Sequence, residues 1–177
     1  MTPAAFNKAA RAVKLLVFDV DGVLTDGGLY YGADGEAFKR FNVKDGHGIV
    51  MARLTGLPSA VLTARTSKIV AVCGDELKLS AIVQGQKYKA PGLQTLCAGL
   101  GLQASDCAYM GDDLNDLPPM ELAGLTACPS DAAPEVRSQV DFVSKLPGGH
   151  GAVRDFVERV LKAQGRWQQA LDAMRNA

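Results

Sequence analysis

The sequence predicts an α/β fold: a doubly wound, Rossmann-like parallel sheet that carries one small β-hairpin. Short apolar runs alternate along the chain with longer amphipathic stretches, which is typical of parallel strands joined by helices. Strands in such sheets are buried on both faces and are therefore continuous apolar runs. The expected strands span residues 15–18, 59–63, 80–84, 107–110, 125–128 and 141–144.

Helical patterns lie between the strands, over residues 48–55, 67–77, 91–100, 113–123 and 134–140. Gly56 and Pro58 follow the first of these patterns, as expected where a helix ends. With helices on both faces of a parallel sheet, ligands bind beyond the carboxyl ends of the strands. The strand ends are therefore the first place to search for a site.

Residues 27–42 interrupt the alternation. Asp34 and Gly35 stand between two extended stretches, which indicates a β-hairpin with a tight turn. The insertion is too small to form a separate domain. We therefore expect one domain over residues 1–177.

The chain ends in an expected helix over 152–163 and a shorter helical stretch that contains Trp167 and Leu171. A Gly-Gly-His-Gly segment at 148–151 precedes them. Because glycine leaves the backbone freest, this segment can act as a hinge. We expect a mobile C-terminal tail over about 148–177.

Composition excludes several classes of protein. Lys plus Arg and Asp plus Glu number 19 each, so the chain lacks the basic excess of most nucleic-acid-binding proteins. No apolar run approaches the roughly 20 residues that span a bilayer, and no secretory pattern is present. We expect a cytoplasmic protein with no nucleic-acid partner and no membrane partner.

Two strand ends carry carboxylates. Asp19 follows the first strand directly and Asp21 comes two residues later, while Asp112, Asp113 and Asp116 follow the strand at 107–110. Such residues can simply cap turns or helices. Clustered carboxylates repel one another without a cation, however, and Mg²⁺ prefers oxygen ligands. The two acidic strand ends therefore predict a magnesium site.

Two further strand ends add donors for a phosphate group. Thr63 ends the second strand and offers a hydroxyl and a backbone N–H, and Arg65 follows it. Lys89 stands two residues before Pro91 at an expected helix start, where an ordinary solvated lysine is the alternative interpretation. The ordered set of four strand ends is more specific than any one of its members.

This set resembles the four motifs of the haloacid dehalogenase superfamily. FDVDGVLTDG is similar to the first motif, Thr63 to the second, Lys89 to the third and GDDLND to the fourth. The segments FNVKDGHGI, QGQKYK and GGHGAVRD also resemble family segments, so the likeness covers about residues 13–169. Within the superfamily the chain is similar to small phosphatases of phosphorylated sugar acids, in which a β-hairpin takes the place of a cap.

The resemblance implies a reaction and a role for each motif residue. Asp19 is the implied nucleophile, which forms an aspartyl-phosphate, and Asp21 the implied acid and base. Asp19, the backbone carbonyl of Asp21 and the Asp112 side chain are the implied Mg²⁺ ligands. Lys89 would hold Asp19 and the phosphate, and Thr63 would bind a phosphate oxygen. Two more residues would support the ligands without binding the metal: Asp113 and Asp116.

The resemblance also implies a substrate, 3-deoxy-D-manno-octulosonate 8-phosphate, which belongs to lipopolysaccharide biosynthesis. The implied substrate-binding residues are Asp21, Asn42, Val43, Lys44, Asp45, Gly46, Arg65 and Lys89. Val50, Cys73 and His150 stand where such enzymes often carry arginine, which pairs well with a sugar carboxylate.

The same resemblance implies a homotetramer in which the hairpins build part of the interface and close neighbouring sites, and in which residues 148–151 fold over a neighbour's site. Two alternatives stay open. One is a phosphatase for another sugar-acid phosphate, such as a nine-carbon 9-phosphate. The other is an accessory subunit of a complex like phenylphosphate carboxylase.

Overall fold

The computed structural model describes residues 1–176, so the last residue of the expected tail, 177, lies outside it. Its main sheet has six parallel strands in the order β5-β4-β1-β6-β7-β8. The strands are β1 (Leu15–Phe18), β4 (Ser59–Leu62), β5 (Ala81–Val83), β6 (Cys107–Met110), β7 (Leu125–Cys128) and β8 (Phe142–Val143). The predicted fold class is confirmed, and each strand agrees with the sequence pattern to within one residue at either end.

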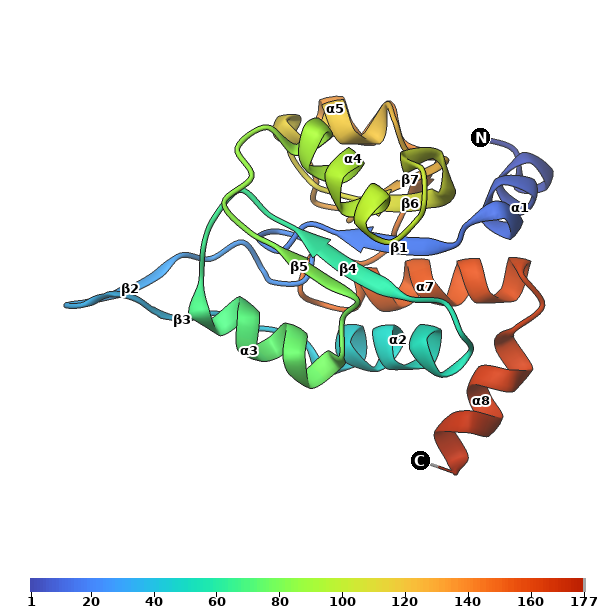
Figure 1. Cartoon of the computed structure of the whole chain (residues 1–177), viewed down its shortest axis with the longest axis horizontal. Coiled ribbons are helices and arrows are strands. Elements are labelled where there is room, and N and C mark those ends of the chain that lie inside the picture. The colour runs from blue at the N-terminus through green and yellow to red at the C-terminus, as the bar shows by residue number, and fades with distance from the viewer. Residues whose placement is uncertain (177) are drawn as a thin grey trace.

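Helices cover both faces of this sheet (Figure 1). Successive strand residues alternate between the two faces, so that Leu16 and Phe18 pack into one core while Leu15 and Val17 pack into the other. The first core contains residues of α1 (Pro3–Ala12), α2 (Val43–Leu54), α3 (Lys68–Leu77), α7 (Ala152–Ala163) and α8 (Trp167–Arg175). The second contains residues of α4 (Lys89–Gly99), α5 (Leu117–Met120) and α6 (Pro134–Arg137).

The strand order places a switch point at β1. The chain leaves β1 towards β4 and β5, and it then returns to β6 on the other side of β1. At such a switch point the connections diverge from the carboxyl ends of adjacent strands and leave a crevice between them. Asp19 and Asp112 lie just beyond the ends of β1 and β6, at this crevice.

Three of the predicted helices differ from the prediction by three residues or more at one end. Helix α2 begins at Val43, five residues before the predicted start, with Asn42 as its N-cap. The helix predicted over 113–123 is instead a 3₁₀ turn, Leu114–Asp116, followed by the single turn α5. Pro118 and Pro119 stand in that turn and lack the N–H groups that a longer helix would need. Helix α6 ends at Arg137, three residues early.

Helix α1 was not predicted from the sequence. Thr2 caps its N-terminus by accepting a hydrogen bond from the backbone N–H of Ala5, and Pro3 occupies the first helical position. Its buried residues, Phe6 and Ala10, are four positions apart and therefore lie on one face. This combination of cap, proline and spacing is the signal that could have found the helix.

The hairpin is confirmed. Strands β2 (Tyr30–Gly32) and β3 (Gly35–Phe38) form a separate two-stranded antiparallel sheet that projects from the body of the protein (Figure 1). The rings of Tyr30 and Phe38 stack at a centroid distance of 4.3 Å. Leu29, Tyr31 and Phe38 remain exposed, so the hairpin region presents large apolar side chains on the surface of the protein.

The glycine-rich segment at 148–151 lies against the loop that follows β1. A Cβ atom on Gly148 would come within 1.8 Å of the carbonyl oxygen of Gly22, so that only glycine fits there. The backbone N–H of Gly149 donates to the carbonyl oxygen of Val23 at 3.0 Å. Movement of the tail stays a prediction. Over residues 1–176, the helices are all too short or too polar to cross a bilayer.

Candidate active site

A cleft of about 290 Å³ opens at the carboxyl ends of β1, β4 and β6. Most of the polar residues predicted at the strand ends line this cleft. They are Asp19, Asp21, Thr63, Arg65, Lys89, Asp112 and Asp113. Residues up to 94 positions apart meet in this cleft because the parallel strands all end at this edge of the sheet.

Asp19 is held from two directions. Its backbone N–H donates to the carbonyl oxygen of Met110 at 2.9 Å, which ties the end of β1 to the end of β6. Its Oδ2 lies 2.8 Å from Nζ of Lys89. Its other oxygen, Oδ1, is buried and has no hydrogen-bond partner within the described chain. One oxygen is thus anchored while the other is left to bind a cation or attack an electrophile.

Lys89 bridges two carboxylates in the interior. Its side chain is fully buried, and Nζ lies 2.7 Å from Oδ1 of Asp116 as well as 2.8 Å from Asp19. Asp116 also accepts a hydrogen bond from the hydroxyl of Tyr109 at 2.7 Å. Its Oδ2 accepts from the backbone N–H groups of Asp112 and Asp113, at 3.0 and 3.3 Å. Asp116 therefore positions both Lys89 and the loop that carries Asp112.

Tyr109 was missed by the sequence analysis. It stands inside a wholly apolar strand, where an aromatic residue is expected as core. A fully buried tyrosine nevertheless needs a partner for its hydroxyl, and this requirement was the available signal.

The acidic residues of the cleft suit a divalent cation. Carboxylate oxygens of Asp19, Asp112 and Asp116 lie within 4.8 Å of one another, against the single positive charge of Lys89. Burial and the charge of Asp116 raise the pKa of Asp19 to about 6, and burial with the charges of Asp116 and Asp19 raises the pKa of Asp112 to about 8. A bound cation stabilises the ionised form of carboxylates whose pKa is raised in this way.

The hydrogen bonds of the cluster show which carboxylate oxygens are free to bind a metal ion. Asp116 already accepts from four donors, whereas Oδ1 of Asp19 accepts from none. Gly22 lies against Asp112 with φ of +86°, and a Cβ atom there would come within 2.1 Å of Oδ2 of Asp112. The glycine therefore leaves room for the Asp112 carboxylate at the cleft. These oxygen donors fit Mg²⁺.

This cluster predicts a pH dependence for the metal-free protein. The pKa of Asp112 rises from 3.8 to about 8 on folding, so between these values the native state binds more protons than the unfolded state. The free energy of unfolding should therefore fall as pH rises from about 4 to 8. Urea titrations in chelator at several pH values should show this fall, and Mg²⁺ should reverse it at pH 8.

Asp112→Asn should remove much of that slope, because the amide does not titrate. Asp172→Asn, an exposed carboxylate of α8, should keep the wild-type slope. A metal-free stability that is flat between pH 4 and 8 would show that Asp112 ionises normally.

Asp21 lies beside the base of the hairpin and is paired with two cations. Nζ of Lys39 contacts Oδ1 of Asp21, and Nε of Arg65 lies 3.7 Å from Oδ2. Lys39 was also missed by the sequence analysis, since its pairing arises only when the hairpin folds back on the domain.

Known proteins resemble this chain over most of its length. Residues 60–154 match the family model of the haloacid dehalogenase-like hydrolases. The 3-deoxy-D-manno-octulosonate 8-phosphate phosphatase KdsC of Escherichia coli is 40% identical over 170 residues, which cover 95% of this chain and 90% of that protein. The chain belongs to the haloacid dehalogenase-like hydrolases.

Solved structures of this hydrolase family superpose closely. One is the 3-deoxy-D-manno-octulosonate 8-phosphate phosphatase of Moraxella catarrhalis in complex with a magnesium ion, a phosphate ion and a KDO molecule. It gives a TM-score of 0.91 at 36% identity and covers 96% of this chain and 97% of that one. A putative hydrolase of the superfamily from Legionella pneumophila gives 0.93 at 33% identity, over 98% and 96% of the two chains. The predicted membership of the superfamily is confirmed.

The stretch from Asn42 to Gly46 lies elsewhere in this hydrolase. All of its residues except Lys44 line a second cavity of about 320 Å³, together with Val50 and Cys73, and none of them lines the acidic cleft. Asn42 caps α2 and donates to the carbonyl oxygen of Gly149 at 3.1 Å. Val43 and Lys44 are exposed in the first helical turn.

Asp45 acts as a cap for helix α7. Its buried carboxylate accepts from the backbone N–H groups of Gly151 and Arg154, at 3.0 and 2.9 Å. Burial raises the pKa of Asp45, while these N–H donors oppose that rise. Both oxygens of Asp45 thus accept hydrogen bonds within the chain, which ties the start of α7 to α2.

Proposed function

We propose that this chain is a Mg²⁺-dependent phosphomonoester hydrolase that works through an aspartyl-phosphate at Asp19. Its proposed substrate is 3-deoxy-D-manno-octulosonate 8-phosphate. One observation carries the reaction: Asp19 has one oxygen anchored by Lys89 and one unpartnered, beside a second, half-buried carboxylate, that of Asp112. The substrate rests on the activity named for the Escherichia coli relative, at 40% identity across 95% of this chain.

The reaction has two displacements. In the first, a carboxylate oxygen of Asp19 attacks phosphorus, and the bond to the sugar oxygen breaks while Asp21 gives that oxygen a proton. In the second, water attacks the same phosphorus, Asp21 takes its proton, and the bond between Asp19 and phosphorus breaks. Splitting one displacement into two lowers the barrier of each. A positioned acid and base contributes about 10²–10⁴ in rate.

The remaining cleft residues hold the phosphate and its charge. Lys89 offsets the negative charge of Asp19 and of the phosphoryl group, and the hydroxyl of Thr63 donates to a phosphoryl oxygen. Asp19, the backbone carbonyl of Asp21 and the side chain of Asp112 would hold the metal, while Asp113 and Asp116 support the loop around it. Bound Mg²⁺ supplies the positive charge that lets an anionic nucleophile approach an anionic ester.

The sugar end of the substrate is assigned to Arg65 and to the stretch Asn42, Val43, Lys44, Asp45 and Gly46. Because that stretch lies away from the acidic cleft of its own subunit, its role fits a homotetramer in which neighbouring subunits complete each site. The exposed apolar hairpin is the proposed contact between subunits. A cytoplasmic location and a role in lipopolysaccharide biosynthesis belong to the same proposal.

A second candidate substrate is another sugar-acid phosphate, such as a nine-carbon 9-phosphate. Val50 and Cys73 line the cavity formed by the stretch from 42 to 46, and neither residue carries a charge that would bind a carboxylate. This chemistry favours a substrate whose carboxylate is recognised elsewhere or weakly.

A panel of sugar phosphates tests the function. With Mg²⁺, kcat/KM should be highest for octulosonate 8-phosphate, by at least tenfold over the nine-carbon 9-phosphate and over simple hexose phosphates. Chelator should remove the activity and added Mg²⁺ should restore it. A preference for the nine-carbon ester would favour the second candidate, and activity that is indifferent to chelator would refute the metal assignment.

A further inference from the structure

We propose that Lys39 is a positioning residue for Asp21. In this inference, which rests on the proposed function, the hairpin supplies from within the same subunit the cation that orients the catalytic acid and base. The hairpin then contributes to the chemistry of its own site, apart from any contact with a neighbouring subunit.

The contacts of Lys39 are those of a buried anchor. Its side chain is 2% exposed, and Nζ lies between Oδ1 of Asp21 and Oε1 of Glu36, the latter at 3.0 Å. Lys39 does not line the acidic cleft, so it reaches a substrate only through Asp21. A lysine in this position directs a carboxylate without touching the phosphate.

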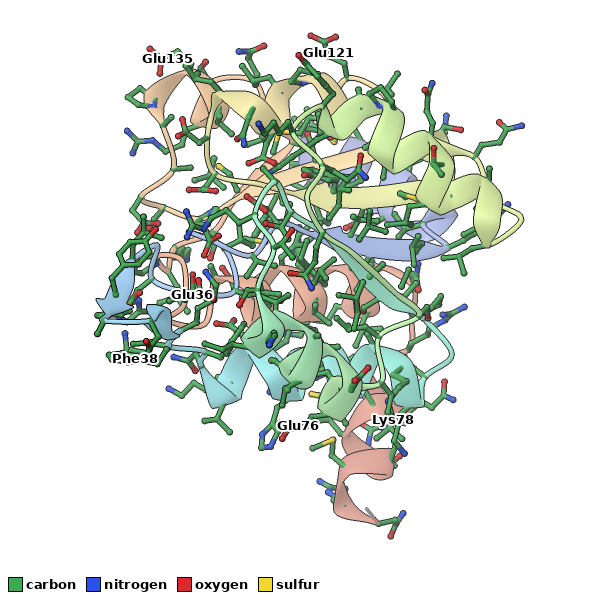
Figure 2. All side chains as sticks on the ribbon, turned by 60° about the vertical axis from the view of Figure 1, so that its left-hand side comes forward. Glu36, Phe38, Glu76, Lys78, Glu121 and Glu135 are labelled. Atoms are coloured by element: carbon green, nitrogen blue, oxygen red, sulfur yellow. The ribbon has the colours of Figure 1, made fainter. Side chains whose placement is uncertain are left out.

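Glu36 fixes the other side of Lys39. It accepts a hydrogen bond from the hydroxyl of Ser67, which also caps helix α3 by accepting from the backbone N–H groups of Ile69 and Val70. Figure 2 shows Glu36 between the hairpin and α3, whereas Phe38 points away from the body of the protein. The hairpin stem is therefore tied to the rigid start of a helix, and this tie sets where Nζ of Lys39 stands.

The charges around Lys39 suit a role in orienting the carboxylate of Asp21. Glu36 and Lys39 together carry no net charge, so the lysine gives Asp21 a hydrogen-bond direction without a full compensating cation. Arg65, at 3.7 Å from Oδ2 of Asp21, is 40% exposed in its side chain and is also bound at 3.0 Å to the hydroxyl of Tyr31. Lys39 is the more buried and more direct of the two partners.

Esters with different leaving groups can distinguish a positioning role of Lys39 from an effect of Lys39 on the stability of the protein. An alkyl phosphate expels a strongly basic alkoxide and needs the proton of Asp21, whereas p-nitrophenyl phosphate expels a weakly basic phenolate that needs none. For both esters kcat/KM reports formation of the aspartyl-phosphate. Lys39→Met should therefore lower kcat/KM for the sugar phosphate by about 10²-fold and for p-nitrophenyl phosphate by less than about threefold. Hydrolysis of the intermediate should also slow, which gives a burst of p-nitrophenolate.

The controls are Lys39→Arg, Lys39→Gln and Lys8→Met. Lys39→Arg should recover at least tenfold of the loss in kcat/KM for the sugar phosphate, whereas Lys39→Gln, with a polar but uncharged side chain, should reproduce that loss. Lys8→Met, which removes an exposed lysine of α1, should leave kcat/KM unchanged for both esters. In an Asp21→Asn background, Lys39→Met should cost nothing further. Each protein is checked by its melting temperature before it is assayed.

Two results would overturn the inference: equal losses on the two esters, or a further loss in the Asp21→Asn background. An inactive wild-type protein would instead refute the proposed function, so the two failures are distinguishable.

Discussion

Asp19→Asn is expected to abolish phosphate release, with kcat lower by about 10⁴-fold or more. The amide is a poor nucleophile, and no other side chain in the cleft combines a buried, unpartnered carboxylate oxygen with a contact to Lys89. The loss should appear equally for sugar phosphates and for p-nitrophenyl phosphate, because both require the same attack. Steady-state phosphate release measures it directly.

The covalent step can be seen separately. Wild-type protein quenched in acid during turnover of a labelled ester should carry label that hydroxylamine removes, as expected for an acyl phosphate, and the Asp19→Asn protein should carry none. Asp172→Asn, on the exposed face of α8, should label as wild type. Label in the Asp19→Asn protein would place the nucleophile elsewhere.

Folding should survive this substitution. Burial and the charge of Asp116 raise the pKa of Asp19 to about 6, above its ordinary value of 3.8. Above pH 6 the ionised group therefore costs the native state free energy, and a neutral amide removes that cost. The metal-free Asp19→Asn protein should melt at or above the wild-type temperature at pH 8. Inactivity can then be assigned to chemistry.

The sheet and the acidic strand ends were accessible from the sequence because they follow from local patterns. Each central strand is an apolar run bounded by polar residues, and parallel strands place their ends at one edge. Asp19, Thr63, Lys89 and Asp112 are therefore predictable as neighbours, and the structure brings them into one cleft. Their roles in the reaction remain predictions until the substitutions are made.

The start of α2 could not be predicted from local sequence patterns. Gly48 marked the predicted start of this helix and Gly46 lay outside it, yet both lie within the helix. A Cβ atom on Gly48 would come within 3.1 Å of Cα of Arg154, so this glycine serves the close packing of α2 on α7. Asp45 likewise binds backbone groups more than 100 residues away. Such constraints exist only in the folded chain, as does the pairing of Lys39 with Asp21.

Lys89→Met should cause the largest loss of stability. Methionine keeps most of the length of the side chain and removes the charge that lies between Asp19 and Asp116, both buried. Removing one member of a buried ion cluster costs about 3–5 kcal/mol, because the partners are left unpaired. For a chain of this size the melting temperature should fall by roughly 10 °C. Lys87→Met, an exposed lysine two residues earlier, should change it little.

A double-mutant cycle with Asp116→Asn shows whether that loss arises from the cluster. If the cost of Lys89→Met is the unpaired charge of Asp116, the double variant should be less destabilised than the sum of the single variants by about 1–3 kcal/mol. Its activity should nevertheless stay low, since Asp19 and the phosphate both still lack Lys89. Additive losses of stability would instead mean that Lys89 contributes through packing of its stem. The buried lysine would then be needed for catalysis but not for holding the acidic residues together.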